Sequence, residues 1–158
     1  MRRDLVRIVV AIASLVGATA ACSDAAGPAL VGREYGLETI DGQALPLIVS
    51  ATTSGDTTWL IGEHVDFESG GRATRTSYYR AVVGSGPGTI TQSGSTYAYQ
   101  VRGAQVSLQP ICPANASCIA GFTGTLSDQR LVLSQQYAPE GTVWVYERAT
   151  IGIADVAR

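Results

Sequence analysis

"STYAYQVRGAQVSLQP", residues 95–110, is the stretch that decides the fold. Apolar and polar side chains alternate with a period of two on both sides of Gly103-Ala104, which is typical of two antiparallel strands joined by a tight turn. The side chains predicted to face inward are Tyr97, Tyr99, Val101, Val106 and Leu108. Those predicted to face solvent are Gln100, Arg102, Gln105, Ser107 and Gln109. The stretch therefore predicts a β-hairpin with one buried face and one wet face.

The same alternation returns along the chain. In "GFTGTLSDQRLVLSQQ", residues 121–136, and "GTVWVYERA", residues 141–149, it predicts a hairpin and a last strand whose inward side chains include Leu126, Leu131, Leu133 and Trp144. In "TTWLIGEHVDF", residues 57–67, it places Trp59, Ile61, Val65 and Phe67 on one side, where Glu63 also falls. "RATRTSYYRAVV", residues 72–83, predicts a more polar strand.

No stretch between Ala29 and Thr150 shows an apolar stripe with the 3.6-residue period of a helix. The chain is therefore predicted to be all-β, with about seven to nine antiparallel strands in sequence order. Closing them into an up-and-down barrel removes the exposed edges of an open sheet, so a barrel is the expected architecture. A two-sheet β-sandwich is the alternative.

An opening motif precedes these strands. Residues 35–46 place an aromatic residue, alternating residues, Asp41-Gly42 and Leu45-Pro46 in that order. This pattern, with the hairpins and the closing Trp-Val-Tyr-Glu-Arg, resembles the lipocalin-like lipoproteins of bacterial envelopes, which are small calycin-type barrels. The resemblance implies a lipocalin-like barrel whose interior binds a small apolar ligand. Arg148 from the last strand either covers Tyr35 in a cation–π contact or is a solvated strand-end arginine.

Aromatic side chains are the candidates for a ligand site in the barrel interior. The candidate residues are Tyr35, Trp59, Tyr97, Tyr99, Trp144 and Tyr146. Two interpretations stay open: the rings line a cavity for a ligand, or they fill the core. An apolar cavity above roughly 300 Å³ with an open mouth favours the ligand, and a packed interior favours a structural or interaction module of the cell envelope.

The first 21 residues have the features of an export signal. Three arginines, at positions 2, 3 and 7, precede an uncharged run from Ile8 to Ser23, and this run becomes polar too early for a stable membrane span. Ala20-Ala21-Cys22 resembles a bacterial lipoprotein signal, which implies lipidation of Cys22 and cleavage before it. The alternative is an ordinary cleavage site at Ala18-Thr19-Ala20, which leaves a soluble secreted protein.

Lipidation of Cys22 would make residues 22–29 a flexible tether between the membrane and one barrel domain, residues 30–150, followed by a short tail, residues 151–158. The resemblance places the protein in the bacterial cell envelope, on the outer membrane facing the periplasm, because Ser23 follows the cysteine. The length from Cys22 to Arg158, 137 residues, fits one domain. The lipid anchor makes the membrane the expected partner.

Charge and cysteine content narrow the function classes. Without the leader, eight basic and twelve acidic residues remain, a net charge of −4, so nucleic acid is not an expected partner. Cys112 and Cys118 lie in the loop "PICPANASCIA", residues 110–120, and a disulfide between them is expected after export. A metal or redox pair is the alternative, but no partner ligand lies nearby in the sequence.

No set of residues predicts an enzyme, and we expect no catalytic residue, no metal and no cofactor. His64, the single histidine, shares a strand face with Asp66 and Glu68, and this triplet is either a small metal site or the wet face of the strand. We expect the wet face. The predicted function is therefore a non-enzymatic envelope lipoprotein that binds a small hydrophobic ligand, with the filled-barrel interaction module as the alternative.

Overall fold

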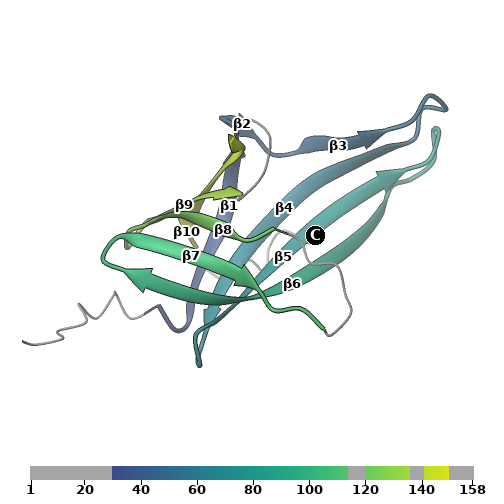
Figure 1. The fold of residues 1–158 in the computed structure, drawn as a ribbon. Helices are drawn as coiled ribbons and strands as arrows, with labels where there is room; N and C mark the ends of the chain where they lie inside the picture. The colour runs from purple at the N-terminus through teal and green to yellow at the C-terminus, as the bar shows by residue number, and fades with distance from the viewer. Residues whose placement is uncertain (1–29, 114–119, 136–140, 150–158) are drawn as a thin grey trace, which may run out of the picture.

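The structure, a computed structural model, describes residues 30–113, 120–135 and 141–149. These residues form ten β-strands and no α-helix (Figure 1). The strands are β1 Arg33–Ile40, β2 Gln43–Ala44, β3 Leu47–Ala51, β4 Thr57–Glu68, β5 Arg72–Val82, β6 Thr89–Arg102, β7 Gln105–Pro110, β8 Phe122–Leu126, β9 Arg130–Gln135 and β10 Val143–Arg148. No helix within the described ranges has the length and apolar character needed to cross a bilayer.

Eight of these strands form a closed antiparallel barrel. From β4 to β10 each strand pairs with the next in sequence, and β1 pairs with both β10 and β4, which completes the ring. The predicted all-β, up-and-down barrel is confirmed, as is the predicted pairing of the first and last strands. A two-sheet sandwich is excluded, because all ten strands belong to one continuous sheet.

The two additional strands follow the Asp41-Gly42 turn. Both turn residues have positive φ, 49° and 77°, which is the backbone of a two-residue hairpin turn and explains the Asp-Gly pair in the sequence. The Asp41 carboxylate accepts a hydrogen bond from the Val143 N–H at 2.7 Å. β2 folds back onto the end of β1, and β3 then pairs with the first residues of β4.

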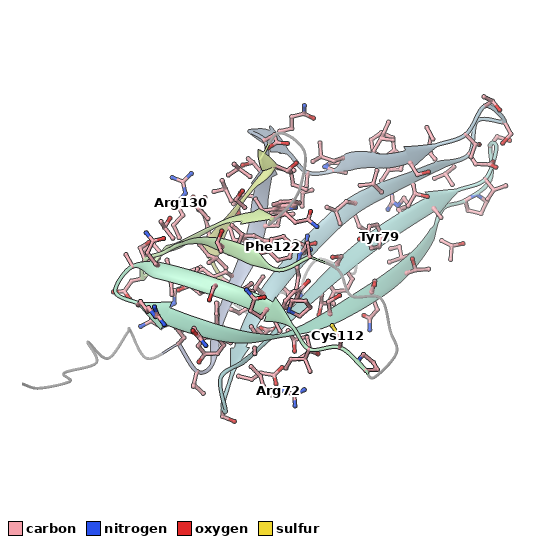
Figure 2. The ribbon with its side chains drawn as sticks, viewed as in Figure 1. Arg72, Tyr79, Cys112, Phe122 and Arg130 are labelled. Carbon is pink, nitrogen blue, oxygen red and sulfur yellow. The ribbon has the colours of Figure 1, made fainter. Side chains whose placement is uncertain are left out.

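The barrel interior is packed with apolar and aromatic side chains. All nine side chains predicted to face inward across the hairpins and last strand belong to the buried core or pack against it. The predicted outward set is also confirmed: the three glutamines and Arg102 are exposed and Ser107 is half-buried. Two rows of rings in edge-to-face contact cross the interior, Tyr35–Phe67–Tyr99 and Tyr97–Phe122–Trp144. Phe122 lies among the interior side chains in Figure 2, whereas Arg72 and Arg130 project outward.

The prediction for Trp59 is wrong, because β4 contains a bulge between Leu60 and Gly62. The extra residue shifts the alternation by one position. Leu60 therefore faces the core, and Trp59 lies half-buried on the outer face, where its indole N–H donates to the Thr57 hydroxyl at 3.2 Å.

β4, β5 and β6 are longer than the barrel needs, and their ends form an open extension. We define this extension as β3, residues 57–60 of β4, residues 79–82 of β5 and residues 89–91 of β6, which are joined by cross-strand pairs. It reaches away from the barrel in Figure 1. β7 pairs with β6 only from Tyr97 to Arg102, so the barrel ring ends at Tyr97 on this side.

Candidate functional site

Glu63 is a buried acid at the end of the barrel that leads into the extension. It lies on β4 opposite Ser77 of β5, and its side chain is only 1 % exposed. Its two carboxylate oxygens accept three hydrogen bonds: Oε1 from Arg75 and from Tyr146, and Oε2 from Ser77 at 2.5 Å. A carboxylate removed from water is tolerated only when it is paired and hydrogen-bonded, and this one is.

Arg75 supplies the positive charge that faces Glu63. Its Nε lies 2.7 Å from Glu63 Oε1, and its guanidinium carbon lies 4.9 Å from the centre of the Phe122 ring and 5.7 Å from that of Trp144. Burial alone would lower the pKa of Arg75, but Tyr146 and Glu63 more than reverse this and raise it above its ordinary value. Arg75 is therefore a permanent cation, and its side chain stays 17 % exposed.

Tyr146 completes the pairing from β10, which β1 separates from β4 in the barrel ring. Its hydroxyl donates to Glu63 Oε1 at 2.5 Å, across 83 residues of sequence. Burial raises the pKa of Tyr146 well above its ordinary value, the positive charge of Arg75 opposes this, and the negative charge of Glu63 adds to it. The phenol therefore stays protonated and acts as a donor.

Tyr97 differs from Tyr146 in having a buried hydroxyl without a partner. The residue is fully buried, and its hydroxyl oxygen has no hydrogen-bond partner among the described residues. It lies near enough to Arg75 to contribute to the raised pKa of that guanidinium. A buried hydroxyl with no protein partner costs about 1–3 kcal/mol unless a bound water or a ligand accepts its hydrogen bond.

These residues define the mouth cluster: Glu63, Arg75, Ser77, Tyr97 and Tyr146. Cross-strand register places it where the closed barrel gives way to the extension. Toward the extension, the successive interior-facing pairs of β5 and β6 are Ala73–Tyr97, Arg75–Ser95 and Ser77–Ser93. Below the cluster the interior is filled by rings, and above it β6 has lost its β7 neighbour.

Five of the six predicted interior aromatic residues lie where the sequence placed them. Tyr35, Tyr97 and Tyr146 are fully buried, Trp144 is 9 % exposed, and Tyr99 packs against the core. Trp59, on the outer face, is the exception described above. The structure brings Tyr97, Trp144 and Tyr146 together around Arg75, whereas Tyr35 lies at the opposite end, where its hydroxyl donates to the Ser127 carbonyl.

The arginine that covers aromatic rings is Arg75 from β5. Arg148 pairs with Tyr35 across β1 and β10, but its side chain is exposed, and both cation–π contacts found within the described residues involve Arg75. Arg148 is thus the solvated strand-end arginine, the second of the two interpretations. The Tyr35 end is closed by the turn between β8 and β9, where Arg33 pairs with Asp128 at 2.6 Å.

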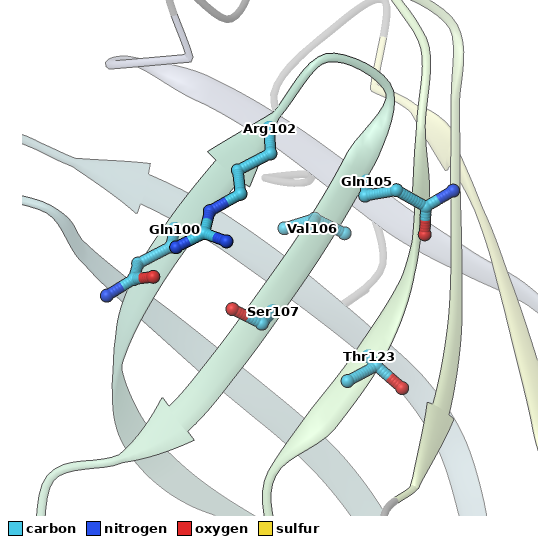
Figure 3. Close-up of a pocket in the computed structure, with 6 residues that line it drawn as sticks. All are labelled: Gln100, Arg102, Gln105, Val106, Ser107 and Thr123. Carbon is cyan, nitrogen blue, oxygen red and sulfur yellow. The ribbon is translucent and has the colours of Figure 1, made fainter. Parts of the chain in front are cut away.

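A shallow depression of about 310 Å³ lies on the outer face of the β6–β7–β8 sheet (Figure 3). Its lining residues are Gln100, Arg102, Gln105, Val106, Ser107 and Thr123. Four of them, Gln100, Arg102, Gln105 and Ser107, are polar side chains that the hairpin pattern predicts to face solvent. Thr123 is exposed on β8, and the Val106 side chain belongs to the core. The depression is therefore part of the wet face and is distinct from the mouth cluster.

Two predicted modification sites involve residues outside the described ranges. Cys22 lies in the leader region and Cys118 in the β7–β8 connection. The lipidation of Cys22 and the Cys112–Cys118 disulfide stay predictions.

Comparison with protein-family models, with curated proteins and with solved structures found no match to this chain.

Proposed function

We propose that this protein is a non-enzymatic, lipid-anchored binding protein of the bacterial cell envelope, and that the mouth cluster is its ligand site. The observation that carries the proposal is the Tyr97 hydroxyl, which is buried beside the fixed cation Arg75 and has no hydrogen-bond partner in the part of the chain that the structure describes. The export signal and Cys22 support the envelope location.

The chemistry of the mouth cluster selects the ligand class. Tyr97 has an O–H donor to offer, and the ion pair with Glu63 uses the Nε–H of Arg75, one of five guanidinium donors. The rings of Phe122 and Trp144 add an apolar wall. A ligand with a carbonyl or carboxylate oxygen on a small apolar body matches both features, because it satisfies the hydroxyl and covers the rings.

The packed interior sets where such a ligand would lie. Below the cluster, Phe67 contacts Tyr99 in one row of rings and Phe122 contacts Trp144 in the other, so we expect the ligand in the mouth and the first part of the extension. The alternative function, an interaction module with a filled barrel, draws support from the same packing. The two functions make different predictions for the Tyr97 hydroxyl: in the binding protein it donates a hydrogen bond to the ligand, and in the interaction module it binds no ligand.

Fluorescence titration distinguishes the two functions. The chain has two tryptophans, so Trp59→Phe leaves Trp144 as the single reporter, at the site itself. The probes are decanoate, its methyl ester and decanol. We expect saturable quenching by decanoate or its ester, and a Kd about fivefold higher in Tyr97→Phe, the effect of losing one neutral hydrogen bond.

Tyr99→Phe is the matched control, because Tyr99 lies two residues further along the same inward face and its ring packs against Phe67. It should leave the Kd unchanged. Absence of saturable quenching with all three probes, or equal affinity in Tyr97→Phe and its parent, would favour the interaction module.

A further inference from the structure

A second cluster of ligating side chains lies on the outer face, where β1 and β4 close the barrel. Glu34 of β1 is directly opposite Asp66 of β4, and Gly36 is opposite His64. One potential ligand atom from each of Glu34, His64 and Asp66 lies within 4.8 Å of the others. The sequence grouped His64 and Asp66 with Glu68. The β1–β4 pairing that closes the barrel, here called the seam, instead supplies Glu34 as the third member.

His64 is oriented toward the carboxylates by its surroundings. Its Nε2 lies 3.1 Å from Asp66 Oδ2, and its ring packs beside Tyr78, with ring centres 5.6 Å apart. Nδ1 is buried and has no hydrogen-bond partner in the described part of the chain, so Nε2 is the ring nitrogen that faces ligands. Gly36, opposite, has no side chain to compete for the space.

The charges around this cluster favour an added cation. Like charges directly opposite on neighbouring strands are destabilising, and Glu34 faces Asp66 in this way. Burial and the charge of Glu68 raise the pKa of Asp66, against the opposing effect of His64. Of the nearby arginines, Arg33 is paired with Asp128, and Arg72 is opposite Glu68.

We propose that Glu34, His64 and Asp66 bind one divalent transition-metal ion, with Zn²⁺ the best match, and so fasten β1 to β4. One imidazole nitrogen and two carboxylate oxygens are ligands that Zn²⁺ accepts, and a water would complete a four-coordinate site. The seam gains most from such a link, because β1 and β4 share only four residue pairs. This site lies on the outer face and does not depend on the proposed function of the mouth cluster.

Binding is tested on the untagged full-length protein after EDTA treatment and buffer exchange. Titration with ZnCl₂ by calorimetry should give one site per chain, and Zn²⁺ at 100 times its Kd should raise the Tm by about 5–10 °C. Glu34→Gln and His64→Gln should each raise the Kd at least tenfold. Co²⁺ in place of Zn²⁺ should produce visible absorption bands that both variants lose.

Glu38→Gln is the matched control, since Glu38 is an exposed acid on the same strand outside the cluster. It should bind Zn²⁺ as the parent does. Far-ultraviolet circular dichroism establishes that each variant is folded. The proposal is overturned if the parent shows no saturable binding below about 1 mM Zn²⁺. It is equally overturned if Glu34→Gln and His64→Gln, both folded, bind with parental affinity, because the metal then lies elsewhere.

Discussion

The closed barrel and the open extension share three strands, β4, β5 and β6, yet apolar side chains are buried in the barrel and exposed in the extension. In the barrel part of β6, Tyr97 is fully buried and Tyr99 packs against the core. In the extension part of the same strand, Ile90 is 53 % exposed, and Ile48 of β3 is equally exposed. Alternation assigns side chains to faces, but only a neighbouring strand or a facing wall buries a face.

The boundary between the two regions is where the polar mouth cluster lies. On one side of it the sheet curves back on itself, and on the other it ends in two edges, β3 and the start of β6. At this level the Glu63 carboxylate is buried, whereas the Arg75 side chain keeps 17 % of its surface exposed. The transition from closed to open sheet therefore holds a paired buried acid beside a cation that stays partly exposed, which is the basis of the proposed ligand site.

The largest expected effect is on the free energy of unfolding, and it differs between substitutions of the two tryptophans. Trp144→Ala removes a core ring that contacts Phe122 and Arg75, so we expect it to lower the free energy of unfolding by about 3–5 kcal/mol. Trp59→Ala, in the half-buried outer face of the extension, should cost about 1 kcal/mol or less. Urea denaturation measures both. Equal costs would mean that the extension is as tightly packed as the barrel.

The second prediction concerns the ion pair at the boundary. Glu63→Gln leaves the Arg75 charge without its counter-ion, and we expect a loss of about 3 kcal/mol. Adding Arg75→Met should restore part of that loss, because the double variant has no unpaired buried charge. A double-mutant cycle by urea denaturation gives the coupling. Additive losses would show that Glu63 and Arg75 do not stabilise each other.

The third prediction compares the two buried tyrosines of the mouth cluster. Tyr146→Phe removes a donor from the Glu63 carboxylate, so stability should fall by about 1–3 kcal/mol. Tyr97→Phe removes a hydroxyl that has no hydrogen-bond partner within the described ranges, so the ligand-free protein should keep its stability or gain up to about 1 kcal/mol. Thermal unfolding of both variants checks this. A destabilised Tyr97→Phe would reveal a partner for that hydroxyl in the free protein.

The sequence predicted the hairpins because their information is local, and it predicted ring closure from the general need to remove the exposed edges of a sheet. In residues 95–110 the alternation continues without interruption on both sides of the turn, and each inward residue is apolar. β4 was harder, because a bulge adds one residue without leaving any mark in the alternation. In the sequence, Trp59 and Ile61 continue the inward pattern of Val65 and Phe67. In the structure, Leu60 is the residue that faces the core.

The mouth cluster could be recognised only in part. Glu63 on an apolar face was a visible signal, but its partner Arg75 lies in a strand whose polar character hid its inward face. Tyr146 reaches Glu63 from 83 residues away, a contact that depends on the register of closure. The Glu34–Asp66 pairing depends on the same register, which is why the sequence grouped His64 with Glu68.

The smallest expected effect lies at the seam that closes the barrel. The folded-state pKa of Asp66 is raised above its ordinary 3.8, chiefly by burial. Protonation of this carboxyl therefore contributes stability that is complete below pH 3.8 and is lost as the pH rises through the folded-state pKa. At pH 7 without metal, the ionised Asp66 faces Glu34 and neighbours Glu68, and His64 Nε2 lies 3.1 Å from its carboxylate.

Asp66→Asn removes this ionised carboxylate, so in EDTA at pH 7 its Tm should exceed that of the parent by about 1–3 °C. The difference should shrink as the pH falls toward 4, because the parent then becomes neutral at this position. Saturating Zn²⁺ should reverse the order, since only the parent keeps all three proposed ligands. A Tm difference that is independent of pH in EDTA would show that the carboxylate charge does not strain the seam. The barrel would then close there without the electrostatic cost that an added cation is expected to relieve.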